Sequence, residues 1–81
     1  MEVIFSPYVR QAQDIYALRW GGRTPKTEYI GQIVYPNGVA PDHKVGENYA
    51  VVTLANGKKA SFGALGHYDR IRRWVREEVK K

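Results

Sequence analysis

The chain has 81 residues, a formal net charge of +5 and no cysteine. This length has room for one hydrophobic core, so residues 1–81 are expected to form a single domain. The lack of cysteine excludes disulfides, thiolate metal sites and a thiol nucleophile, and it suits a cytoplasmic protein. No apolar run approaches the ~20 residues that cross a bilayer, and Met1–Pro7 lacks the pattern of an export signal, so no membrane partner is expected.

The charge is strongly basic, with thirteen Lys and Arg against eight Asp and Glu. An excess of cations attracts polyanions such as nucleic acids over long range. Many small proteins carry a similar charge for solubility alone. The positions of the cations along the chain therefore decide more than their total.

The first quarter of the chain is expected to contain a short strand followed by a helix. Glu2–Phe5 has the character of a strand, and Ser6-Pro7 places an N-cap residue before a proline at the first helical position. A helical wheel of residues 7–20 gathers six apolar residues on one arc. They are Tyr8, Val9, Ala12, Ile15, Tyr16 and Trp20. We expect a helix over residues 7–20, ended by Gly21-Gly22.

The same segment also permits a strand over Ile15–Trp20. In that interpretation Tyr16, Leu18 and Trp20 alternate onto one face, and residues 21–27 turn the chain into the next strand. The cap, the proline and the double glycine favour the helix over this strand.

The middle of the chain is expected to form β-structure. Glu28–Tyr35 is rich in β-branched and aromatic residues and is a predicted strand. Residues 36–48 contain two prolines and two glycines and predict a long loop. Tyr49–Ala55 and Lys58–Phe62 predict a hairpin, in which Asn56-Gly57 favours a type I′ turn with positive φ at both residues.

The last segment, His67–Lys81, predicts an amphipathic helix. A wheel places Tyr68, Ile71, Trp74, Val75 and Val79 on one arc and the basic residues on the other side. The ordinary interpretation is a solvated charged face, in which i,i+4 pairs such as Asp69 with Arg73 absorb some of the cations.

The functional interpretation is that this charged face joins the cations of the predicted hairpin tip into one surface that matches a phosphate backbone. Arg23 and Lys26 are expected to assist. The residues expected to bind nucleic acid are therefore Lys58, Lys59, Arg70, Arg73, Arg76, Lys80, Arg23 and Lys26.

About half of the chain resembles the double-stranded-RNA-binding domains. The resemblance lies in an α-β-β-β-α order, in Pro41-Asp42-His43 before a long strand, and in alternate residues that lead to a turn. These residues are Tyr49, Val51, Thr53, Ala55, Asn56 and Gly57. The resemblance implies that His43 lies in a loop that reaches a minor groove and that binding follows duplex shape. The lysine cluster that opens the family's last helix is replaced here by residues 67–69, His-Tyr-Asp.

The side chains that could transfer protons or hold a metal are few. They are His43, His67, Asp14, Glu28, Asp42 and Asp69. Histidine adjoins a carboxylate in Asp42-His43 and is two residues from one at His67, but no metal-ligand spacing or phosphate-binding glycine loop accompanies them. We expect no enzyme activity, no metal and no cofactor.

Two further hypotheses remain open. Strands that carry Tyr29, Tyr35, Tyr49 and Phe62 offer a platform on which unpaired bases stack, although one small core also needs such rings. Alternatively, a compact basic chain without a catalytic pattern suits a small viral or plasmid-borne inhibitor that binds a partner protein or a nucleoprotein complex.

The elements together predict a single α+β domain in the order β-α-β-β-β-α, with an antiparallel sheet and both helices on one face. The expected function is non-catalytic binding of duplex RNA or DNA through its backbone. Nucleic acid is the expected partner, with a protein as the alternative, and the chain is expected to be a monomer or a small homo-oligomer.

Overall fold

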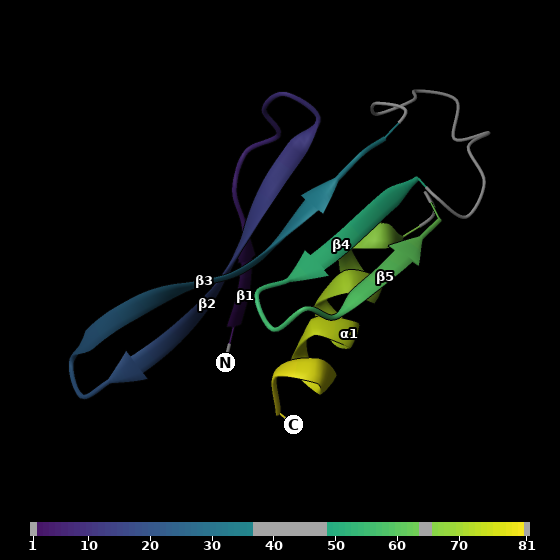
Figure 1. The fold of residues 1–81 in the computed structure, drawn as a ribbon. Helices are drawn as coiled ribbons and strands as arrows, with labels where there is room; N and C mark the ends of the chain where they lie inside the picture. Colours follow the sequence, from purple (N-terminus) through teal and green to yellow (C-terminus); the bar gives the residue numbers. More distant parts are fainter. Residues whose placement is uncertain (1, 37–48, 64–65, 81) are drawn as a thin grey trace.

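The computed structural model describes residues 2–36, 49–63 and 66–80. They form a curled, five-stranded antiparallel sheet in the order β1-β2-β3-β4-β5, with one helix against it (Figure 1). The strands are β1 Glu2–Phe5, β2 Ala12–Gly21, β3 Thr24–Val34, β4 Ala50–Leu54 and β5 Lys59–Phe62, and the helix is α1 His67–Lys80. These residues thus form an α+β domain with an antiparallel sheet, as expected, and among them there is one helix in place of the two that were predicted.

The predicted helix over residues 7–20 is wrong, and with it the order β-α-β-β-β-α. Residues 12–21 form β2, which pairs with β1 on one side and with β3 on the other. Its alternate residues Gln13, Ile15 and Ala17 are buried. A strand in this position gains two hydrogen-bonded ladders, which outweigh the local helix signals. Ser6 supports the strand directly, because its Oγ accepts a hydrogen bond of 2.7 Å from the backbone N–H of Asp14.

The turn from β1 to β2 has an unusual backbone. Val9 and Ala12 exchange two backbone hydrogen bonds of 3.0 and 3.1 Å across a two-residue loop. The two loop residues, Arg10 and Gln11, have φ values of 53° and 62°. Positive φ at both central positions is the mark of a type I′ turn, which here is made without glycine or asparagine.

The predicted hairpin of β4 and β5 is confirmed, but its predicted type I′ turn is wrong. Gly57 has a φ of 92°, whereas Asn56 is not among the residues with positive φ. The N–H of Gly57 donates to the carbonyl of Leu54 at 2.9 Å, and the N–H of Leu54 donates to the carbonyl of Lys58 at 2.8 Å. This is the pattern of a three-residue loop with a glycine bulge.

The ribbon of β2 and β3 extends past the rest of the sheet. These strands pair continuously from Ala12 and Val34 to Gly21 and Thr24, whereas β1 reaches only as far as Leu18 and β4 pairs only with residues 31–34 of β3. Residues 16–29 of this ribbon are called the arm below, and its outer part, residues 19–28, lies beyond the pairing with β1 and β4 and projects from one end of the molecule (Figure 1). β3 therefore begins four residues before its predicted start at Glu28.

The two faces of the sheet differ in what covers them. On the helix-side face, cross-strand partners such as Ile33 and Val52 are buried against Ile71 and Val75 of α1. The opposite face, called the open face below, carries Ile4, Tyr16, Tyr29, Gln32, Thr53 and Lys59. A bulge at Ile30 keeps Tyr29 and Gln32 on this same face.

The helix α1 confirms the predicted amphipathic segment. Ile71 and Val75 are fully buried, and Trp74 and Val79 pack against the core from the side. The helix contacts both edge strands, β1 and β5, and so closes the curl of the sheet. Within the described parts of the chain, no helix has the length and apolar character needed to cross a membrane.

Candidate nucleic-acid interface

Three arginines of α1 form an exposed stripe. Arg70, Arg73 and Arg76 follow one another at intervals of three residues, and all three are exposed. Residues three apart lie on one side of a helix, so the stripe spans about 9 Å along the axis. Asp69 pairs instead with Arg72, whose Nη1 lies 3.5 Å from the carboxylate, and this leaves the stripe outside that ion pair. These three arginines are therefore open to solvent, and Asp69 and Glu77 lie beside them on the exposed side of the helix.

Arg72 has a different role from the stripe. Its guanidinium carbon lies 4.9 Å from the centre of the Phe5 ring, in the geometry of a cation–π contact. This contact fastens α1 to β1, the first strand of the sheet.

The lysines of the β4–β5 hairpin do not continue the stripe. Lys59 pairs with Thr53 on the open face, whereas its neighbours Ala60 and Phe62 are half-buried on the helix side. Phe62 packs on Trp74 of the helix with ring centres 5.9 Å apart. Lys59 and the arginine stripe thus lie on opposite sides of the domain, and Lys58 lies in the connection between β4 and β5. The continuous surface expected from the sequence is divided.

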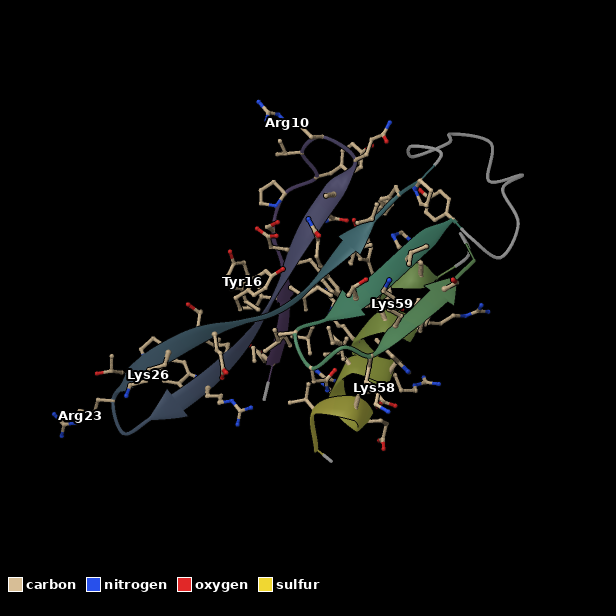
Figure 2. All side chains as sticks on the ribbon, in the orientation of Figure 1. Arg10, Tyr16, Arg23, Lys26, Lys58 and Lys59 are labelled. Carbon is tan, nitrogen blue, oxygen red and sulfur yellow. The ribbon has the colours of Figure 1, made fainter. Side chains whose placement is uncertain are left out.

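A second group of cations lies on the arm. Arg23 is in the turn, where Gly22 has a φ of 68°, and Lys26 lies close by on β3 (Figure 2). Lys26 is paired across the ribbon with Arg19. The only carboxylate of the arm, Glu28, lies 4.0 Å from Arg19. Three cations against one carboxylate leave the arm basic.

The arm also carries an exposed aromatic surface that the preferred interpretation of the sequence missed. Trp20 is 69% exposed and Tyr29 is 50% exposed. Tyr29 contacts Tyr16 edge to face, with ring centres 6.0 Å apart. The alternation of Tyr16, Leu18 and Trp20 is the sequence signal for this surface. It belongs to the strand interpretation of Ile15–Trp20, over which the helix was preferred.

The other rings proposed for base stacking are used inside the protein. Tyr35 and Tyr49 are buried, and their ring centres are 5.5 Å apart. His67 lies against both rings, and its Nε2 is 3.3 Å from the Tyr35 hydroxyl. Of the four rings of the predicted platform, Tyr29 remains available.

A hydrogen-bonded network surrounds the buried side chain of Gln13. Its Oε1 accepts hydrogen bonds from the hydroxyls of Tyr35 and Tyr68, and its Nε2 donates to the carbonyl of Ser6 at 2.9 Å. Burial, followed by the neighbouring tyrosines, raises the pKa of Tyr35 above its ordinary value, and burial also raises the pKa of Tyr49. His67 lies at the edge of this network, against the rings of Tyr35 and Tyr49.

The three candidate catalytic carboxylates that the structure describes lie on different elements. Asp69 pairs with Arg72, Glu28 lies on the arm, and Asp14 lies on β2. Among residues 2–36, 49–63 and 66–80, no three histidine or carboxylate side chains are grouped closely enough to hold a metal ion. Asp42 and His43 lie outside the described residues, as does the predicted loop beyond Pro36, and the side chain of Lys80 is likewise outside the description.

Comparison of the chain with protein-family models, with curated proteins and with solved structures finds no match. The α-β-β-β-α order of the double-stranded-RNA-binding domains is not seen in the structure, because a strand takes the place of the first helix. The case for nucleic acid therefore depends on the surfaces described above.

Proposed function

We propose that the protein binds nucleic acid without catalysis, by contacts between its cations and the phosphate backbone. The observation that carries the proposal is the stripe of Arg70, Arg73 and Arg76, three exposed guanidinium groups on one side of a rigid helix. Guanidinium groups form paired, charge-assisted hydrogen bonds with phosphate oxygens. At an axial rise of 3.4 Å per nucleotide, a stripe of about 9 Å matches about three phosphates of one duplex strand.

The placement of the remaining cations supports a helix-side surface. Alternation along the arm places Arg19 and Lys26 on the same face as the buried Ala17, which is the helix-side face. A duplex that lies along the stripe has these two cations on the side of the sheet that it approaches. Lys58 and Lys59 are expected to contribute less to duplex binding, because Lys59 faces away from α1.

Charge reversal tests this assignment. Arg73→Glu/Arg76→Glu is expected to weaken binding to a duplex DNA or RNA probe by at least tenfold, since it replaces two attractive phosphate contacts by repulsive ones. Arg10→Glu/Lys59→Glu is the matched control, because it makes the same change in net charge outside the stripe, in the turn from β1 to β2 and on the open face of the sheet (Figure 2). Mobility shifts with both variants give the comparison, and circular dichroism checks the fold. Equal losses in the two variants would show that total charge, and not the stripe, governs binding.

A second candidate function is binding and inhibition of a partner protein. The exposed Trp20 and Tyr29 favour it, because aromatic residues are enriched in the cores of protein interfaces. Such a complex is expected to survive nuclease treatment and to depend weakly on salt. Isolation of the tagged protein from lysate with and without nuclease separates this function from nucleic-acid binding.

A further inference from the structure

We infer that the aromatic surface of the arm, made by Tyr16, Trp20 and Tyr29, binds unpaired bases of single-stranded nucleic acid by stacking. The inference rests on the proposed function and adds a second site to it, with its own form of nucleic acid. The first site is the arginine stripe of α1, for the phosphates of a duplex. The second lies on the open face of the ribbon, at the opposite side of the sheet.

Trp20 and Tyr29 are exposed to solvent and are not used in the core. Trp20 is 69% exposed in a domain that has only ten aromatic residues and one small core. A tryptophan in the core would bury roughly 150–250 Å² of surface, so its placement on a projecting ribbon forgoes a large stabilisation. Its cross-strand neighbour is Pro25, which adds a flat apolar surface and not a cover.

The three rings are spaced along one face of the ribbon. Tyr16 and Tyr29 face one another across the strands, and Trp20 lies four residues further along β2 on the same face. At about 3.3 Å per residue, the tyrosine pair and Trp20 are ~13 Å apart. The rings are therefore separate stacking points, as on the sheets of single-strand-binding proteins, where successive bases rest on separate aromatic side chains.

The charge of the arm distinguishes nucleic acid from an apolar protein surface. Arg23 lies in the turn beyond Trp20 and Pro25, and Arg19 and Lys26 are the sequence neighbours of these two residues, with side chains that alternate onto the other face of the two-stranded ribbon. Glu28 lies close to Arg19 and is the one acidic side chain of residues 19–28. Rings bordered by cations match a chain in which flat bases alternate with phosphates.

The test uses single-stranded and duplex probes with variants of the arm. Trp20→Ala is expected to weaken binding of a thymidine oligonucleotide by about tenfold, since loss of one stacking ring costs on the order of 1–3 kcal/mol. Tyr29→Ala is expected to act in the same direction, and Trp20→Phe is expected to restore most of the affinity. Val9→Ala is the control, because Val9 is 60% exposed and lies outside the arm, in the turn from β1 to β2. Binding is measured by fluorescence anisotropy of a labelled oligonucleotide.

The intrinsic fluorescence of Trp20 gives an independent readout. The oligonucleotide is expected to quench the wild-type signal, and Trp20→Phe is expected to abolish most of the quenching while it keeps the affinity, because Trp74 is packed against Phe62 and lies away from the arm. If Trp20→Ala and Tyr29→Ala bind the single strand as the wild type does, or lose duplex and single-strand binding equally, the inference is wrong and the duplex site stands. If the wild type binds neither probe, the proposed function itself fails.

Discussion

Arg10 and Gln11 hold a backbone conformation that other residues adopt more easily. In the left-handed region the backbone conformation costs about 1 kcal/mol or more for L-residues with a side chain. The cost is absent for glycine and smaller for asparagine. Both residues are exposed, and the conformation is fixed by the hydrogen bonds between Val9 and Ala12. The sequence offers no local reason for the turn at this point; pairing between β1 and β2 imposes it.

We therefore expect Arg10→Asn/Gln11→Gly to raise the free energy of unfolding by about 1 kcal/mol. Urea denaturation at neutral pH measures the change. Arg10→Ala/Gln11→Ala, which leaves both residues in the strained region, is expected to give no gain. A loss of stability in the Asn-Gly variant would contradict the type I′ assignment.

Tyr35 makes the stability of the fold depend on pH in the alkaline range. Its hydroxyl is buried and donates to Gln13, and burial raises the pKa of Tyr35 above the value of about 10 that it has in the unfolded chain. Between these two pKa values the folded state binds more protons than the unfolded state, so stability falls as pH rises. Below about pH 10 the stabilisation is fully present.

The expected result is a urea midpoint that is level up to about pH 9 and then declines steeply toward pH 11. Tyr35→Phe is expected to lower stability at neutral pH by about 1–2 kcal/mol, because Gln13 loses a buried donor, and to flatten the alkaline decline. Tyr16→Phe, on the open face, serves as the control. A decline of equal slope in Tyr35→Phe and the wild type would show that another group causes it.

At the scale of the elements, β3 and β4 approach one another more closely at Gly31 than a side chain permits. A Cβ at this position would lie 2.7 Å from the carbonyl oxygen of Thr53 and 2.9 Å from Cδ2 of Leu54. The leucine side chain has some freedom to move, but the backbone oxygen belongs to the strand that pairs with β3.

Gly31→Ala is accordingly expected to lower the free energy of unfolding by about 1–3 kcal/mol, the range typical of an overpacked core. Thermal unfolding followed by circular dichroism measures it. Gly63→Ala is a suitable control, because a Cβ there meets no atom within 4 Å and the backbone of Gly63 is not in the left-handed region. Wild-type stability in Gly31→Ala would mean that β4 shifts freely along β3.

The elements also show which parts of the fold can be predicted from the sequence and which cannot. The last helix and the β4–β5 hairpin are confirmed because their signals are local: an apolar arc at helical spacing and glycine in a short turn. Residues 7–20 mislead because Ser6-Pro7 resembles a helix start, while the pairing that makes β2 a strand comes from residues 2–5 and 24–34. Pairing with strands that are distant in sequence cannot be inferred from a local residue pattern.

At the scale of the whole molecule, the same limit applies to the binding surface. The charge of the helix face was readable from its spacing, and the structure shows Arg70, Arg73 and Arg76 exposed on it. The expected union with Lys59 depended on which side of the sheet each strand residue faces. That side is set by strand register, which places Lys59 with Thr53 on the open face. The aromatic surface of the arm was likewise visible only once β2 was a strand.

The division of the cations has a consequence for how ligands are bound. The domain measures 44 × 25 × 20 Å, with the arm at one end (Figure 1). The arginine stripe and the aromatic surface face opposite sides of the sheet, so one rigid duplex does not reach both. A nucleic acid with a duplex region and an unpaired end can contact the two sites together, and effective concentration then raises its affinity above that of either form alone.

The salt dependence of duplex binding measures how many phosphates the protein neutralises. If Arg70, Arg73 and Arg76 each neutralise one phosphate of B-DNA, the logarithm of the association constant falls with the logarithm of salt concentration with a slope of about −2.7. We expect this slope or a steeper one for the wild type, and a slope closer to about −1 for Arg73→Glu/Arg76→Glu. A wild-type affinity that is unchanged between low and high salt would contradict phosphate binding by the arginine stripe.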